Sequence, residues 1–142
     1  MKLILAEHYQ QLLANGRATS AAYAEGTEPP EHRPVVKLFT PDAQCTWLLS
    51  ELDPDEPDIA FGLCDLGFGT TELGSVRISE LEAIRGQLGL PVERDRFFKP
   101  AYTLTVYARA AQRMQGITEY PEYLDDAQAD LQAEWAENGI EV

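Results

Sequence analysis

Two tight reversals near the middle of the chain divide residues 44–87 into three strand-like runs. Cys45–Leu52 is rich in strand-forming residues, and it stops at the two prolines and three acids of residues 53–57. Asp58–Leu66 then resumes with apolar residues at every second position. Because a five-residue connection is within the usual range for a hairpin, this part predicts two adjacent antiparallel strands.

A second reversal and a short helix complete this central region. Gly67 and Gly69 can adopt a positive φ without strain, and they lead into a third run, Glu72–Ile78. The residues that follow, SELE, fit a capping box in which the Ser79 hydroxyl and the Glu82 carboxylate each accept a bond from a free backbone N–H. The pattern therefore predicts a meander of strands closed by a helix.

The flanks of the central region predict a further strand and three helices. Residues 3–15 have helical periodicity with Gly16 as a stop, and residues 17–33 are polar and small, which indicates a loop or linker. A short strand over residues 35–39 follows. Two more helices are predicted over residues 103–115 and 121–138. The apolar stripe of the last helix comprises Leu124, Ala127, Leu131 and Trp135.

These elements predict an α+β fold in a single domain, residues 1–142. We expect a four-stranded antiparallel meander with about four helices packed against one face of the sheet. The strands are expected at about 35–39, 45–52, 58–66 and 73–78.

The charge distribution is the most unusual global feature. The net charge is −13, and both 38–76 and 114–142 hold eight acids and no base, whereas 77–113 carries a net charge of +3. Direct nucleic-acid binding is disfavoured, because contact with phosphates requires Lys and Arg. A basic partner protein is the natural inference, although a highly soluble surface would explain the same charge.

Two acidic groups are the candidate partner-binding residues. The first forms a stripe along the last helix, with members three or four residues apart, so its charges repeat about every 5–6 Å along the axis. It comprises Glu122, Asp126, Asp130, Glu134 and Glu137, and Glu141 continues it. The second group is the turn that contains Asp53, Asp55, Glu56 and Asp58. A solvated outer face is the alternative interpretation of the helical stripe.

No catalytic set, cofactor or metal site is predicted. The acidic turn would suit a hard cation, but its spacing matches no calcium loop. His8 and His32 lie in unrelated segments, and Asp65 is a candidate buried acid without a recognisable partner. Cys45 and Cys64 are expected nearly opposite each other on adjacent strands; free thiols are expected in a reducing compartment, although a disulfide is geometrically conceivable.

The chain also lacks the pattern of a secreted or membrane protein. Its first residues hold only a four-residue apolar run, which is too short for a secretory signal. No run approaches the roughly 20 apolar residues that a membrane span requires. A cytoplasmic location is therefore the expectation.

One family resemblance is visible in residues 34–99. The strings TWLLSELDPDEPDIAFGLCDLGFG and ELGSVRISELEAIRG are its most specific parts, and they resemble the bacterial domain of unknown function (DUF) family 2958. The resemblance implies a small cytoplasmic protein of bacterial mobile elements and carries no activity over. The helical ends, residues 1–33 and 100–142, lie outside the resemblance.

The leading functional hypothesis is a non-enzymatic acidic interaction protein. A nucleic-acid-mimicking inhibitor of a host defence or DNA-binding protein is one form of it, because rows of carboxylates would stand in for phosphates. One alternative is a metal-dependent enzyme that uses Asp53, Asp55, Asp58 and Asp65. Another is an accessory homo-oligomer, for example a homodimer, whose interface is formed by helices 103–115 and 121–138.

Overall fold

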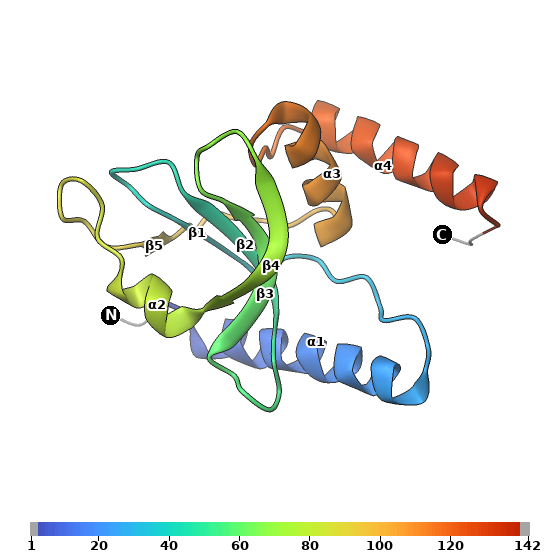
Figure 1. Ribbon diagram of the computed structural model, residues 1–142, viewed down its shortest axis with the longest axis horizontal. Coiled ribbons are helices and arrows are strands. Elements are labelled where there is room, and N and C mark those ends of the chain that lie inside the picture. Colours follow the sequence, from blue (N-terminus) through green and yellow to red (C-terminus); the bar gives the residue numbers. More distant parts are fainter. Residues whose placement is uncertain (1–2, 140–142) are drawn as a thin grey trace.

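The computed structural model describes residues 3–139, which form an antiparallel sheet with helices on both faces (Figure 1). The sheet has five strands in the order β4-β3-β2-β1-β5. The strands are β1 (Val36–Phe39), β2 (Thr46–Leu52), β3 (Ile59–Asp65), β4 (Thr71–Arg77) and β5 (Glu93–Arg94). The helices are α1 (Ala6–Glu25), α2 (Ile78–Ala83), α3 (Leu104–Met114) and α4 (Pro121–Glu137).

The α+β class and all four predicted strands are confirmed, and β5 is an addition. This two-residue strand pairs with β1, with Leu38 opposite Arg94, in a segment that carries no period-two pattern. No helix among residues 3–139 is long and apolar enough to cross a membrane.

The prediction that the helices cover only one face of the sheet is wrong. Trp47 and Leu49 of β2 pack into a cluster with Leu12 and Leu13 of α1, whereas the intervening Leu48 packs into a second cluster with residues of α3 and α4. All three of these β2 side chains are buried. The continuous apolar run of β2 is explained by this arrangement, because a strand covered on both faces does not alternate.

Gly16 does not end the first helix, contrary to the prediction. Helix α1 continues to Glu25, and Gly26 ends it in the left-handed conformation with φ of 74°. A Cβ at position 16 would overlap the backbone carbonyl oxygen of Leu52 in β2. Glycine is therefore required here for the close approach of α1 to the sheet, and only the residues after Gly26 form the predicted linker.

The predicted capping box at Ser79 is also wrong. Helix α2 begins at Ile78, so Ser79 lies inside the helix, and the carboxylate of Asp58 accepts hydrogen bonds from both the Ser79 N–H (2.9 Å) and the Ser79 hydroxyl (2.7 Å). The Ile78 N–H donates to the Asp58 carbonyl at 2.8 Å. The helix is thus capped by Asp58, the residue immediately before β3, rather than by its own Ser and Glu.

The cysteines do not face each other across the hairpin. Cys64 lies opposite Trp47 rather than Cys45, because Leu52 pairs with Ala60 and the turn is therefore centred on Glu56 instead of between Pro54 and Asp55. Both cysteines are free thiols and half-buried. The Cys45 thiol lies 3.7 Å from the carbonyl oxygen of Leu66.

The two C-terminal helices lie where the sequence predicts them. Gln115, with φ of 60°, ends α3, and Pro121 is in the first turn of α4. The apolar stripe of α4 packs against α3: Leu124, Ala127 and Leu131 are buried, and Trp135 is half-buried against the same cluster. The spacing of residues 103–115 predicts that Met114 faces inward, but this prediction is wrong, because Met114 at the end of α3 is 43% exposed.

Candidate functional site

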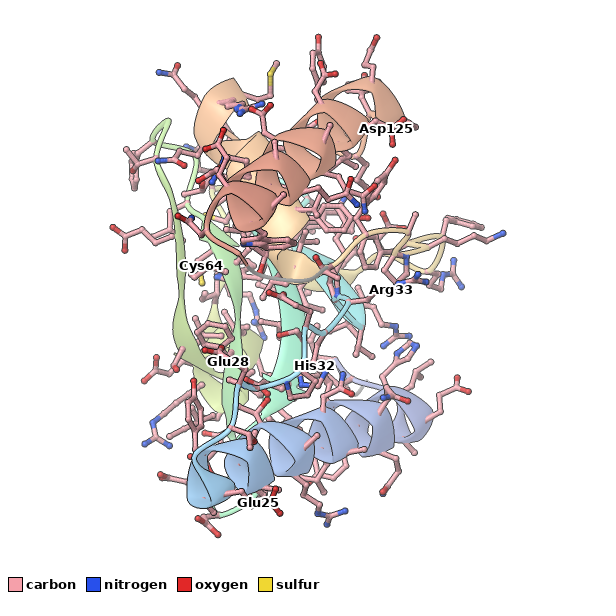
Figure 2. All side chains as sticks on the ribbon, turned by 90° about the vertical axis from the view of Figure 1, so that its right-hand side faces the viewer. Glu25, Glu28, His32, Arg33, Cys64 and Asp125 are labelled. Atoms are coloured by element: carbon pink, nitrogen blue, oxygen red, sulfur yellow. The ribbon has the colours of Figure 1, made fainter. Side chains whose placement is uncertain are left out.

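The acidic stripe of α4 lies on the outer side of the helix. Its five described members, Glu122, Asp126, Asp130, Glu134 and Glu137, are all exposed. Helix α4 carries six acids and no base. Figure 2 shows α4 above the sheet, with Asp125 at its upper edge, while α1 lies below the sheet. Glu141 is outside the described residues.

Two members of the stripe are engaged within the chain. Glu134 accepts a hydrogen bond from Arg109 of α3 at 2.5 Å, and Asp130 forms an ion pair with Arg113. The hydrogen bond from Arg109 lowers the pKa of Glu134. The other three, which we call the outer carboxylates (Glu122, Asp126 and Glu137), form no ion pair within residues 3–139.

Most of the acidic turn serves the fold. Asp53 accepts a hydrogen bond from the N–H of Asp55 at 2.9 Å, which closes the turn locally. Glu56 pairs with Arg77 of β4 at 3.1 Å, and Asp58 caps α2. The hydrogen bond from the Ser79 hydroxyl, followed by that from its N–H, lowers the pKa of Asp58. Asp53 and Asp55 are the members with no ion pair among the described residues.

The structure does not bring the two acidic groups together. The β2–β3 turn lies beside α1, whereas α4 lies beyond α3 on the other face of the sheet (Figure 1). In the described part of the chain, no group of three or more His, Cys, Asp or Glu side chains is arranged to hold a metal ion. The turn and the stripe are therefore separate surfaces.

Asp65 is buried, as its position within a strand suggests, and its carboxylate has a structural role. One oxygen accepts from the Gly67 N–H at 2.9 Å and the other from the Ile117 N–H at 3.0 Å. The first contact fixes the β3–β4 turn, and the second ties the α3–α4 connection to the end of β3. Asp65 thus positions α4 relative to the sheet.

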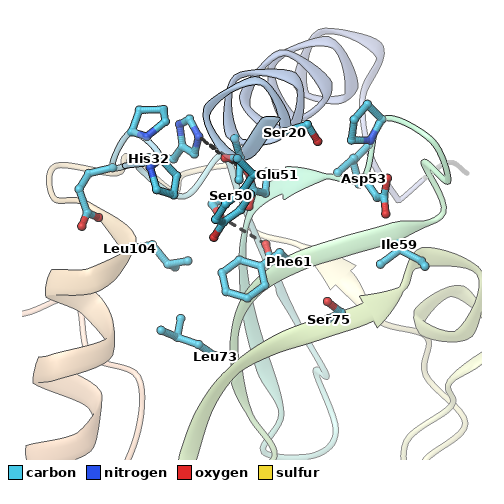
Figure 3. Close-up of a pocket in the computed structure, with 18 of the residues that line it drawn as sticks. Ser20, His32, Ser50, Glu51, Asp53, Ile59, Phe61, Leu73, Ser75 and Leu104 are labelled. Atoms are coloured by element: carbon cyan, nitrogen blue, oxygen red, sulfur yellow. Dashed lines mark hydrogen bonds and ion pairs between the residues drawn. The ribbon is translucent and has the colours of Figure 1, made fainter. Parts of the chain in front are cut away.

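A cluster that the sequence does not reveal lies beside a cavity with a volume of about 590 Å³. The Thr19 hydroxyl donates to Glu51 Oε2 at 2.5 Å and lies 3.0 Å from His32 Nε2. His32 Nε2 is 3.8 Å from the same carboxylate oxygen (Figure 3). The three residues come from α1, the 26–35 linker and β2, so no local spacing connects them.

Comparisons with known proteins identify a family for most of the chain. A family model described as "Protein of unknown function (DUF2958)" matches residues 3–118. The match extends beyond residues 34–99 on both sides and includes α1, the whole sheet and α3, but it ends before α4 begins. No curated protein and no solved structure gives a significant match.

Proposed function

We propose that this chain, which belongs to the DUF2958 family of proteins of unknown function, is a non-enzymatic interaction protein that binds a basic partner protein through the outer face of α4. The observation that carries the proposal is the set of outer carboxylates, which are exposed and without an ion pair among the described residues. A basic surface would supply the counter-charges that α3 supplies only to Asp130 and Glu134.

The charge pattern of α4 supports a binding role over simple solvation. Like charges four residues apart on a helix cost about 0.2–0.5 kcal/mol per pair, and Glu122 and Asp126 form such a pair in which neither carboxylate is paired with an arginine of the described residues. A face that only needed to be soluble would be equally hydrated with mixed charges. A positively charged partner relieves the repulsion, so the cost in the free protein becomes a gain on binding.

The extent of the family match also supports this assignment. The matched region ends at residue 118, and α4 begins at Pro121. The proposed binding helix therefore lies outside the matched part of the chain.

The spacing of the carboxylates suggests the class of partner. Four residues of an α-helix rise by about 6 Å, so the stripe is a regular row of negative charges. Surfaces that bind nucleic acids carry Lys and Arg arranged for a regular row of phosphates. A nucleic-acid-binding or defence protein of a bacterial host fits this pattern. The resemblance of residues 34–99 to the family supports a cytoplasmic setting on a mobile element.

An affinity capture experiment with charge-matched variants tests the proposal. The test variant is E122Q/D126N/E137Q, which neutralises the outer carboxylates. The control is E7Q/E80Q/E82Q, which removes the same charge from exposed positions on α1 and α2. The wild type and both variants are used as bait in a bacterial lysate at low and high salt, and the captured proteins are quantified by mass spectrometry.

We expect a basic protein that is retained at low salt by the wild type and by the control but not by the test variant. Retention should fall at high salt, since exposed charges are screened beyond about 10 Å at 0.1 M salt. If every captured protein is retained equally by both variants, the outer face of α4 is not the binding surface.

A further inference from the structure

We infer that a groove on the uncovered part of the sheet binds an arginine side chain presented by a partner protein. The groove is the cavity of about 590 Å³ that Glu51 and His32 line, and we call it the sheet groove. It is a different surface from the outer face of α4, so the inference stands independently of the proposed function.

The sheet groove exists because α3 and α4 cover only part of their face of the sheet. On this face, Leu63 of β3 is buried in the cluster that these helices form. Phe61, two residues earlier, is only half-buried, and its neighbour on β4, Ser75, is exposed. Leu73 remains 47% exposed at the edge.

The walls of the groove come from separate elements. The second half of α1 and the 26–35 linker form one wall, and the start of α3 at Leu104 forms the other (Figure 3). Figure 2 places Glu28 and His32 between α1 and the C-terminal helices. The groove is thus open to a side chain that approaches from solvent.

Glu51 supplies the central recognition group. Its side chain is 17% exposed, and only one of its two carboxylate oxygens, Oε2, is occupied, by the Thr19 hydroxyl and the nearby His32 ring. Within residues 3–139, Oε1 accepts no hydrogen bond. A largely buried carboxylate with a spare acceptor favours a charged donor, and bonds between ionised groups are the strongest available.

The charge of the lining selects a cation. Carboxylates line the groove at five positions, whereas the imidazole of His32 is its single basic group. An anionic ligand would be repelled, and the described residues hold no metal-binding group of three. The positions of the carboxylates are Glu28, Glu31, Glu51, Asp53 and Asp55.

The apolar part of the lining distinguishes arginine from lysine. The ring of Phe61 forms part of the floor, Tyr23 stands 69% exposed at the rim, and two prolines of the linker add a flat apolar edge. A planar guanidinium stacks on such surfaces, and its several N–H donors can reach Oε1 of Glu51 and a second carboxylate of the lining at the same time. A lysine ammonium is more strongly hydrated and gains less from them.

Titration of the ¹⁵N-labelled full chain with three capped amino acids tests the inference. The probes are acetyl-arginine amide, acetyl-lysine amide and acetyl-citrulline amide, the last being a neutral isostere of arginine. We expect saturable shifts of backbone amides around Glu51 with the arginine probe and at least about tenfold weaker binding of the citrulline probe. Equal binding of these two probes, or no saturation by the arginine probe at millimolar concentration, would overturn the inference.

Variants locate the site and separate it from α4. E51Q should lower the affinity for the arginine probe about tenfold, while E80Q on α2 should leave this affinity unchanged. Because Glu51 also contacts Thr19, E28Q/D53N at the exposed rim provides a second test that leaves this contact intact, and we expect severalfold weaker binding. An unchanged affinity in both groove variants contradicts the inference. E122Q/D126N/E137Q should bind the probe like the wild type. The proposal for the sheet groove and the proposal for α4 are therefore tested separately.

Discussion

The carboxylate of Asp58 accepts two hydrogen bonds from Ser79, 21 residues further along the chain, and thereby caps helix α2 from the β2–β3 hairpin. Asp58, which belongs to the acidic turn that the sequence suggests as a binding surface, therefore has a structural role. The same contact joins the end of β4 to the start of β3, since the Ile78 N–H also donates to the Asp58 carbonyl. We expect its removal to weaken the hairpin and α2 together.

The first prediction concerns the pH dependence of this cap. The hydrogen bonds from Ser79 lower the pKa of Asp58 below its ordinary value of 3.8, so the folded state favours the charged carboxylate. This contribution to stability is complete above that value and is lost as the pH falls through the lower pKa of the folded state. D58N should therefore melt at a lower temperature than the wild type at pH 7, and the difference should shrink in acid.

Thermal melts from pH 7 to pH 2.5 measure this effect. D55N, in the same turn but outside the cap, is the control and should follow the wild type across this range. A difference between D58N and the wild type that stays constant down to pH 2.5 would show that the charge of Asp58 does not stabilise the fold.

Gly16 gives the second prediction, because two effects of G16A oppose each other. Alanine favours a helix interior by about 1 kcal/mol over glycine. A Cβ at position 16, however, would overlap the Leu52 carbonyl oxygen, and backbone of a central strand cannot move away easily. Overpacking of this kind costs about 1–3 kcal/mol or more, so we expect net destabilisation in urea unfolding.

G74A is the matched control for this substitution. A Cβ at Gly74 in β4 would have open space around it, so the variant should be neutral or slightly more stable than the wild type. If G16A unfolds at the same urea concentration as the wild type, α1 does not approach β2 as closely as described.

The sequence predicts local features of this fold better than long-range ones. The meander from Cys45 to Ile78 is visible because strand periodicity and glycine turns are encoded within a few residues. The role of Gly16 depends on a carbonyl 36 positions away, at Leu52, and it is therefore invisible in a local pattern. The capping motif at Ser79 misleads for a related reason. The Ser79 N–H and hydroxyl donate to Asp58, 21 residues earlier in the chain, and not to a residue of the local motif.

The candidate site shows the same division. The acidic stripe of α4 is readable from the spacing of Glu122, Asp126 and their successors along one helix. Arg109 and Arg113 neutralise two members of this stripe. These ion pairs depend on how α3 and α4 pack, which the sequence does not specify. The sheet groove depends on α1, the 26–35 linker, the sheet and α3, which meet only in the folded chain.

The third prediction concerns Asp65. D65A would leave the N–H groups of Gly67 and Ile117 without their acceptor. Loss of a partner for buried or partly buried donors costs about 1–3 kcal/mol. We expect D65N to lower the free energy of unfolding less than D65A does, because the amide oxygen of asparagine still accepts one hydrogen bond. Urea unfolding of the two variants checks the order, and the reverse order would contradict the described role of Asp65.

The fourth prediction concerns the anchoring of α4. Leu131 is 5% exposed, and α4 packs chiefly against α3, so L131A should release the helix without unfolding the sheet. Truncation of a buried leucine costs about 2–5 kcal/mol. Hydrogen exchange should accelerate at α4 amides and stay unchanged in β2 and β3. Q132A, at an exposed position of the same helix, should exchange like the wild type.

The most direct test of the central claim is the affinity of the purified captured partner for three forms of the chain at two salt concentrations. We predict that E122Q/D126N/E137Q raises the Kd at least about tenfold at low salt and flattens the salt dependence, because exposed interfacial charges act through screened attraction. E7Q/E80Q/E82Q should stay within about twofold of the wild type. Equal Kd values for the two variants would contradict a partner-binding role for the outer face of α4.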